Sequence, residues 1–192
     1  MNAVILVEGV SDQLALEALA ARRGRDLEAE GISIVPIGGA HAIGHALQRF
    51  GPGGYDVKLA GLCDAGEEGA FTHGLERAGL GTDLSRSDLE ALGFFVCDTD
   101  LEHELVRALE ADSVLRIVEE QEELSSFRTF QKQPAKRELD LEEQLWRFMW
   151  NRKIRYAPLL VHALDLDRVP RPLDGVLAAV TSRAPRTAAD RR

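Results

Sequence analysis

Long hydrophobic runs are absent from this 192-residue sequence. No apolar stretch approaches the roughly 18 residues that a membrane-spanning helix needs, and no basic segment precedes a signal-like apolar one. Neither membrane insertion nor secretion is therefore expected, and we expect a soluble, cytoplasmic protein. With 45% apolar residues, the chain can still bury one substantial core and carry a small appendage.

Cysteine is also scarce, and no Cys/His spacing typical of zinc occurs. The two cysteines, Cys63 and Cys97, each end an apolar run just before an acid, so buried, reduced thiols are the simplest interpretation. His41 and His45 are four residues apart and could form a metal pair, but a solvent-facing pair explains them more simply. Zinc is therefore not expected.

Negative charge is in excess, with a net charge of −9, but it is unevenly distributed. Residues 1–127 hold 9 basic against 24 acidic side chains, whereas residues 128–192 hold 14 against 8. An acidic body beside a basic last third is typical of a protein that holds metal with one part and phosphate with the other. A Pro/Ala/Arg-rich end, residues 182–192, explains part of the asymmetry, and we expect it to be disordered.

Four short apolar runs, separated by segments of helical periodicity, predict a βαβ arrangement around a largely parallel sheet. We expect strands at about residues 3–8, 32–37, 57–63 and 93–97. Ser11 or Asp12 is placed to cap the helix after the first strand. Gly38-Gly39 marks a tight turn into a helix over residues 40–50. The expected fold class is α/β, with helices flanking a mostly parallel four-stranded sheet.

The second half of the sequence has only helical periodicity. Residues 65–92 are rich in glycine and acids and should hold one short helix at most, and no strand pattern returns after Val96. We expect an α/β domain over residues 1–112 and a helical extension packed on it over residues 113–181. The acidic stretch Glu119 to Glu123 is most simply a solvated helix face.

Acidic side chains follow three of the four expected strands. Glu8 ends the first strand, with Asp12 four residues later, Asp64 ends the third, and Asp98, Asp100 and Glu102 follow the fourth. The carboxyl ends of parallel strands meet at one edge of the sheet, where open α/β sheets bind their ligands. Carboxylate oxygens gathered there suit Mg²⁺ or Mn²⁺. The pattern therefore indicates phosphoryl-transfer chemistry.

Ordered motifs along the chain resemble a known family. The Glu8-Gly9 turn, with Asp64 ending a later strand, resembles a TOPRIM domain, the module of topoisomerases, primases and some nucleases. A narrower resemblance, over about residues 3–180, is to the TOPRIM half of the OLD (overcoming lysogenization defect) nucleases. It rests on Val7-Glu8-Gly9-Val10-Ser11-Asp12, Gly31-Ile32-Ser33-Ile34-Val35 leading to Gly38-Gly39, Gly61-Leu62-Cys63-Asp64, Asp100-Leu101-Glu102, Lys153-Ile154-Arg155-Tyr156-Ala157 and Val169-Pro170.

The resemblance implies a TOPRIM, Rossmann-like fold and a set of site residues. It implies that Glu8, Asp12, Asp64 and Glu102 hold one or two Mg²⁺ or Mn²⁺ ions. It also implies that Glu8 and Lys153 are catalytic, with Lys153 facing the scissile phosphate. Two metal ions can activate water and neutralise the leaving oxygen, and a lysine can stabilise the developing charge. Asp100, at a helix start, is expected to cap that helix or to support the ligands from behind.

Two features depart from the family pattern. The usual Asp-x-Asp after the third strand reads Asp64-Ala65-Gly66-Glu67-Glu68, so Glu67 or Glu68 would have to replace the missing second carboxylate. A weaker cage for one metal ion would make cleavage slow, altered or absent. OLD proteins also carry an ATPase, but this chain has no GxxxxGK(S/T) motif, so ATP hydrolysis is not expected. A separate ATPase subunit is a candidate partner.

Aromatic side chains cluster just before Lys153. Helical spacing puts Trp146, Met149, Trp150 and Ile154 on one face. That spacing predicts core side chains rather than stacking partners for bases.

The residues and the resemblance together predict a divalent-metal-dependent DNA endonuclease. Arg152, Lys153 and Arg155 would contact phosphate groups of the nucleic acid. The alternative is a non-catalytic TOPRIM module that binds nucleic acid or protein, and an RNA-processing TOPRIM enzyme is a third hypothesis. DNA against RNA, strand preference, and monomer against homodimer stay open.

Overall fold

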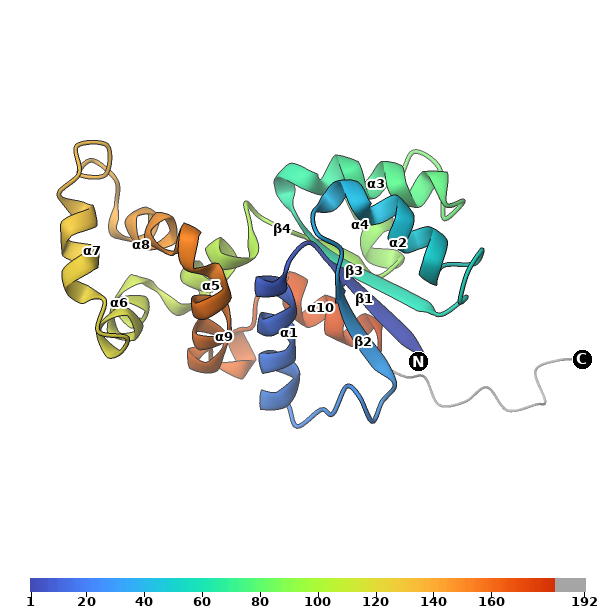
Figure 1. Ribbon diagram of the computed structural model, residues 1–192, viewed down its shortest axis with the longest axis horizontal. Coiled ribbons are helices and arrows are strands. Elements are labelled where there is room, and N and C mark those ends of the chain that lie inside the picture. Colours follow the sequence, from blue (N-terminus) through green and yellow to red (C-terminus); the bar gives the residue numbers. More distant parts are fainter. Residues whose placement is uncertain (182–192) are drawn as a thin grey trace, which may run out of the picture.

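The computed structural model describes residues 1–181 and is built around a four-stranded parallel sheet (Figure 1). The strands are β1 (Ala3–Val7), β2 (Ile32–Pro36), β3 (Lys58–Asp64) and β4 (Phe94–Cys97), in the order β2-β1-β3-β4. Each begins and ends within one residue of the predicted position, and the α/β class is confirmed. The expected disordered end, residues 182–192, lies outside the described residues.

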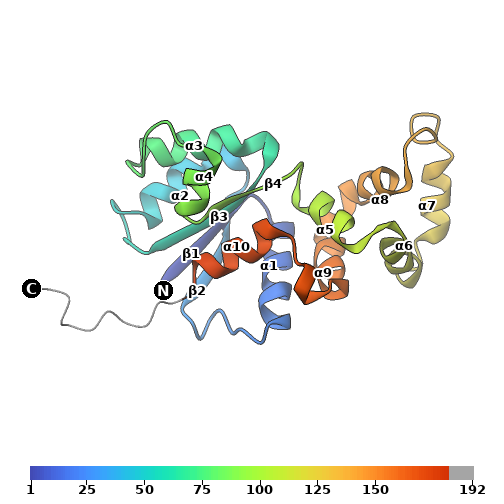
Figure 2. The same cartoon turned by 180° about the vertical axis from the view of Figure 1, so that it is seen from behind.

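Helices cover both faces of the sheet. One face packs against α1 (Val10–Arg22) and α10 (Arg171–Ala179), and the other against α2 (Ile43–Phe50), α3 (Glu68–Arg77) and α4 (Arg86–Ala91) (Figures 1 and 2). Side chains alternate along a strand. Ile5 and Val7 therefore enter the first core, and Val4 and Leu6 the second. Burial on both faces explains the unbroken apolar run of β1.

Two helices, α3 and α4, lie between β3 and β4, where one at most was expected. Glycines within α3 disfavour a helix, but Phe71 and Leu75, one turn apart, are fully buried in the core. The start of α4 is fixed by a capping box between Ser85 and Asp88. The expectation was wrong because packing and capping outweighed weak helix propensity.

The remaining helices all follow β4 in the chain, and the first of them, α5, lies inside the predicted α/β domain of residues 1–112. They are α5 (Leu101–Leu109), α6 (Ala111–Glu120), α7 (Leu124–Gln131), α8 (Leu141–Met149) and α9 (Lys153–Ala163), with short 3₁₀ turns η3 (Trp150–Arg152) and η4 (Leu166–Arg168). Helices α6, α7 and α8 lie at the end farthest from α2 (Figure 1), whereas α9 returns to pack along α1 and α5. The start of α9 thereby meets the start of α5. The domain border at residue 112 stays a prediction.

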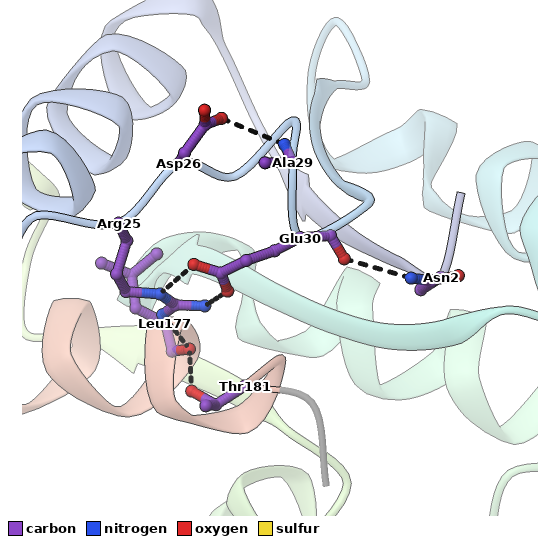
Figure 3. Close-up of polar contacts among 7 residues, drawn as sticks. All are labelled: Asn2, Arg25, Asp26, Ala29, Glu30, Leu177 and Thr181. Carbon is purple, nitrogen blue, oxygen red and sulfur yellow. Dashed lines mark hydrogen bonds and ion pairs between the residues drawn. The ribbon is translucent and has the colours of Figure 1, made fainter. Parts of the chain in front are cut away.

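Polar contacts tie α10 to the connection between α1 and β2 (Figure 3). Arg25 donates to the Glu30 carboxylate through Nε at 3.2 Å and Nη2 at 2.6 Å, and to the Leu177 carbonyl through Nη1 at 2.9 Å. Thr181 Oγ1 donates to the same carbonyl at 3.2 Å, and Asn2 Nδ2 donates to the Glu30 carbonyl at 3.1 Å. The last described helix is thus fixed to the chain beside the sheet. No helix within residues 1–181 is long and apolar enough to cross a membrane.

Candidate metal centre

The carboxyl edge of the sheet has a topological switch point between β1 and β3. The chain continues from β1 to β2 on one side, whereas β3 and β4 lie on the other, and open α/β sheets bind ligands at such points. Glu8 follows β1, and Asp64 ends β3. Glu8 Oε1 accepts a hydrogen bond from the Asp64 N–H at 2.8 Å. Two of the residues predicted from strand ends are therefore neighbours, joined through the Asp64 backbone.

A glycine turn after β2 fixes the backbone of Glu8. The N–H groups of Gly38 and Gly39 donate to the Glu8 carbonyl at 3.1 and 3.0 Å. Their φ angles are +79° and +108°, in the region that glycine adopts without steric cost. The glycine pair thus positions a site residue as well as turning the chain into η1 (Ala40–Ala42) and α2.

Asp12 lies in the first turn of α1 and faces the same edge. Its Oδ2 accepts a hydrogen bond from the Gly9 N–H at 2.8 Å, and Gly9 is the N-cap residue. The expected capping by an Asp12 side-chain oxygen is confirmed, although the N-cap residue itself is Gly9 and Asp12 acts from the first turn of the helix. Burial, followed by the charges of Glu102 and Glu8, raises the pKa of Asp12 to about 7.

Asp64 and Glu8 lie in surroundings that oppose their negative charge. Burial, followed by the charges of Glu8, Asp12 and Asp100, raises the pKa of Asp64 to about 8. Burial also raises the pKa of Glu8, and the charge of Glu67 adds to the effect. Carboxyl groups that are buried and that repel one another in this way favour the binding of a cation.

Lys153, at the start of α9, is a cation within this cluster. Its Nζ lies 2.9 Å from Asp100 Oδ2 and 2.7 Å from Glu102 Oε2. Burial alone would lower its pKa, but Glu102 and Asp100 together raise it, so Lys153 stays charged. The fold therefore joins the lysine to acids far from it in sequence.

Asp100 holds Lys153 in place. It caps α5, with its Oδ1 accepting from the His103 N–H at 2.8 Å and from Trp146 Nε1 at 2.9 Å. Its Oδ2 accepts from Lys153. The expected cap is confirmed, and both oxygens are occupied by protein donors, which fits a positioning role better than direct metal binding.

Glu102, on the first turn of α5, has one unused oxygen. The residue is 1% exposed, and its Oε2 pairs with Lys153. Its Oε1 is buried without a hydrogen-bond partner in the described part of the chain. Burial raises the pKa of Glu102 against the opposing effect of Lys153. Buried oxygens without partners are uncommon and costly, and a bound cation would satisfy this one.

The two glutamates after Asp64 have different surroundings. Arg86 Nε donates to Glu68 Oε1 at 3.1 Å, and a second guanidinium N–H pairs with Glu68 Oε2, so Glu68 is held toward α4. Glu67, in η2 (Ala65–Glu67), is half-buried, and its charge raises the pKa of Glu8. Of the two acids left open by the sequence, Glu67 is the one whose surroundings fit a site residue.

Arg152 and Arg155 lie beside Lys153 and pair with Glu123. Arg152 Nε and Arg155 Nη1 are 3.5 and 3.3 Å from Glu123 Oε1, and the Tyr156 hydroxyl donates to Glu123 Oε2 at 2.6 Å. Treating Glu123 as part of a solvated face was therefore wrong. Its partners lie in or just before α9, about 30 residues further along the chain, and no local pattern in the sequence indicates so distant a contact.

The aromatic face before Lys153 is only partly core. Met149 is buried and Trp146 half-buried, but Trp150 and Ile154 are 56% and 61% exposed. The 3₁₀ turn η3 interrupts the α-helical period after Met149 and turns the next side chains outward. The predicted core role of the aromatic side chains is therefore wrong for Trp150.

The two cysteines and the histidine pair have the surroundings that the sequence predicted. Cys63 and Cys97 are buried free thiols, as expected. His41 and His45 are exposed, and with His73 they line a separate cavity of about 390 Å³ between α2 and α3.

The acid cluster suits a divalent cation chemically, although its side chains are not yet gathered as ligands. Within residues 1–181, no group of three or more His, Cys, Asp or Glu side chains is arranged to hold a metal ion. Glu8 and Asp12 turn to backbone N–H groups, and Glu102 turns to Lys153. Raised carboxyl pKa values and an unpartnered oxygen are both features that a bound cation would offset.

A parallel sheet with acids at the ends of β1 and β3 and a helical continuation is the arrangement that the sequence motifs predicted from their resemblance to TOPRIM domains. Residues 1–65 match the sequence family described as "Overcoming lysogenization defect protein-like, TOPRIM domain". No curated protein matches the chain by sequence.

Solved structures with the same fold come from OLD proteins. The C-terminal region of the Xanthomonas campestris pv. campestris OLD protein is 24% identical, with a TM-score of 0.73 over 93% of this chain and 91% of that one. The C-terminal region of the Burkholderia pseudomallei OLD protein is 21% identical, with a TM-score of 0.72 over 93% of this chain and 96% of that one. The chain therefore resembles the C-terminal half of OLD proteins in fold, as the sequence motifs predicted.

Proposed function

We propose that the chain is a divalent-metal-dependent DNA endonuclease that hydrolyses phosphodiester bonds at the carboxyl edge of its sheet. The observation that carries the proposal is the meeting of four acids, at strand ends or helix starts, with Lys153. The acids are Glu8, Asp12, Asp64 and Glu102. The OLD-like TOPRIM match supports a nuclease-type role, because TOPRIM domains generally bind divalent metal ions.

Each acid has a role in this proposal. Glu8, Asp12, Asp64 and Glu102 would hold one or two Mg²⁺ or Mn²⁺ ions, with Glu67 as a further candidate. A bound ion supplies an activated water and offsets negative charge on the reacting phosphate.

Lys153 would donate through Nζ to a phosphate oxygen as negative charge develops there. Asp100 would hold the lysine for that task, because its other oxygen is fixed by Trp146. A donor that is already in position lowers the reaction barrier more than a donor that must first reorient.

Nucleic acid would approach from the side of α9, where Arg152, Lys153 and Arg155 lie together. Their proximity to the acid cluster supports the predicted phosphate contacts. DNA is the proposed substrate and RNA the second candidate. A separate ATPase subunit is a proposed partner, since the similar solved structures are regions of longer OLD proteins.

A non-catalytic binding module is the alternative. Two observations favour it: Ala65-Gly66 stands where a second carboxylate is usual, and Lys153 competes with any metal ion for Glu102. In that case metal or nucleic acid would bind, but no bond would be cut.

Cleavage of supercoiled plasmid and of single-stranded DNA by the purified chain, with Mg²⁺, Mn²⁺ or EDTA, tests the proposal. Glu8→Gln is the informative variant, because its amide oxygen can still accept from the Asp64 N–H while the charge is removed. Asp98→Asn is the matched control, since Asp98 is an exposed acid after β4 that pairs with Arg107. We expect metal-dependent nicking by the wild type and Asp98→Asn, and none by Glu8→Gln. Absence of nicking in the wild type with every ion would favour the binding module.

A further inference from the structure

An open groove with an exposed tryptophan lies beside the acid cluster. The groove, of about 660 Å³, is formed by the first turn of α1, by η3 and by the start of α9, and Figure 1 shows α1 and α9 side by side. Trp150, Ile154 and Val10 line it and are 56%, 61% and 46% exposed. They are three of the five large hydrophobic side chains that are exposed in residues 1–181.

Cations outnumber acids around this apolar surface. Arg152, Lys153 and Arg155 line the groove against one acid, Glu123. In a chain with 32 acidic and 23 basic residues, the lining thus reverses the overall balance, although Lys153 also pairs with Asp100 and Glu102 beside the groove. Apolar surface mixed with positive charge matches a nucleotide, which has an apolar base face and an anionic phosphate.

Lys153 belongs to both the groove and the acid cluster. Its Nζ lies 5.1 Å from the centroid of the Trp150 ring, and the same atom pairs with Asp100 and Glu102. A base on the Trp150 ring would therefore belong to a nucleotide next to the phosphate that Lys153 contacts.

We propose that Trp150 is a stacking platform for an unpaired nucleobase of the substrate strand, beside the bond to be cut. The inference rests on the proposed function and narrows its substrate class. A base inside a continuous duplex is covered on both faces by its neighbours, so its face cannot reach an indole ring. The groove therefore selects single-stranded, gapped or flapped nucleic acid over intact duplex.

A nucleotide fits this surface better than a protein partner does. A stable protein interface buries about 800 Å² on each partner, which three isolated apolar side chains among cations do not supply. Stacking on one ring needs only the ring face and a neighbouring positive charge.

The test is binding of labelled oligonucleotides to the full chain in EDTA, so that its outcome does not depend on cleavage. The probes are oligothymidine of about 15 nucleotides, the matching oligouridine, and a blunt duplex of the same length. Trp150→Ala removes the platform, and Trp150→Phe restores a ring. Tyr55→Ala is the matched control, since Tyr55 is 63% exposed and is not among the groove residues.

We expect Trp150→Ala to weaken single-strand binding about tenfold, and Trp150→Phe and Tyr55→Ala to change it less than about twofold. Duplex binding should not change. The chain has two tryptophans, so quenching of indole fluorescence by oligothymidine should disappear in Trp150→Phe although binding persists.

Three results would overturn the inference. The first is that Trp150→Ala binds single strands as tightly as the wild type does. The second is that Trp150→Ala loses the same factor of affinity for single strand and for duplex. The third is a Trp150→Phe variant as weak as Trp150→Ala, which would indicate a structural role or a protein partner for the groove. If cleavage still depends on Glu8 while any of these results is found, the proposed nuclease function is retained and only the stacking role of Trp150 is rejected.

Discussion

Buried carboxyl groups at the end of the sheet oppose folding of the metal-free protein. Burial and mutual repulsion raise the pKa values of Glu8, Asp12, Asp64 and Glu102. Groups that cost stability without a ligand are typical of functional sites. The cluster therefore predicts specific effects of pH and of single substitutions.

Asp64→Asn should stabilise the metal-free protein increasingly as the pH rises. The folded-state pKa of Asp64, about 8, lies above its ordinary value of 3.8, so the folded chain holds this proton more tightly than the unfolded chain. The contribution of Asp64 to stability is therefore greatest below its ordinary pKa and falls as the pH rises toward 8. Thermal unfolding in EDTA at about pH 8 should give the variant a midpoint about 3–5 °C above wild type, with a smaller gain at about pH 5.

Asp98→Asn is the control of opposite sign. Hydrogen bonding to Arg107 lowers the pKa of Asp98, so neutralising this residue should bring no gain at high pH. A difference between Asp64→Asn and wild type that is the same at every pH would contradict the assignment of a raised pKa to Asp64.

Lys153→Met should separate metal binding from bond cleavage. The change keeps most of the side-chain volume and removes the charge that would stabilise the reacting phosphate, so cleavage should fall about 100-fold or more. Mn²⁺ binding should persist, because the lysine no longer competes for Glu102. Cleavage rates and Mn²⁺ calorimetry measure the two effects. Lys58→Met, at the exposed start of β3, is the control, and undiminished cleavage by Lys153→Met would remove the lysine from the mechanism.

Helix α9 is the element that assembles the site. It packs along α1, which carries Asp12, and along α5, which carries Glu102. It thereby places Lys153 between these two helices, in contact with Glu102. Its other contact, through Glu123, holds two arginines that could otherwise face phosphate.

Glu123→Gln should release Arg152 and Arg155 and tighten nucleic-acid binding about two- to fivefold at low salt. Fluorescence anisotropy in EDTA over a range of salt concentrations measures the effect. Glu122→Gln changes the charge equally at an exposed neighbour, so it should have a smaller effect. Equal effects of the two variants would mean that overall charge, rather than release of the arginines, controls binding.

Arg25→Ala should lower stability without touching the site. It removes the contacts that tie α10 to the connection between α1 and β2 (Figure 3), including the bond to the Leu177 carbonyl. The thermal midpoint should fall by about 2–5 °C, while Mn²⁺ affinity is unchanged. Arg77→Ala, at an exposed position of α3, should leave both unchanged. Loss of Mn²⁺ binding in folded Arg25→Ala would show that α10 also supports the site.

At the scale of the whole molecule, local sequence patterns predicted the sheet. They missed features that depend on packing between distant residues or on a local change of helix type. The strand ends followed from apolar runs, and acids at two of those ends, Glu8 and Asp64, do meet. The α3 helix was missed because its stability comes from burying Phe71 and Leu75 rather than from propensity. The exposure of Trp150 depends on a single 3₁₀ turn, η3, that helical spacing does not reveal. The metal-binding and catalytic roles stay predictions.

The most direct test of the account is a Mn²⁺ titration of three proteins: the wild type, Asp12→Asn and Asp98→Asn. Binding is measured by calorimetry or by paramagnetic resonance. Asn at position 12 can still accept from the Gly9 N–H, so the fold should be kept while one proposed ligand loses its charge. We expect the wild type and Asp98→Asn to bind Mn²⁺ alike, and Asp12→Asn to bind about tenfold more weakly or worse. Equal affinity of all three, or no binding by the wild type, would contradict a metal centre at this edge of the sheet.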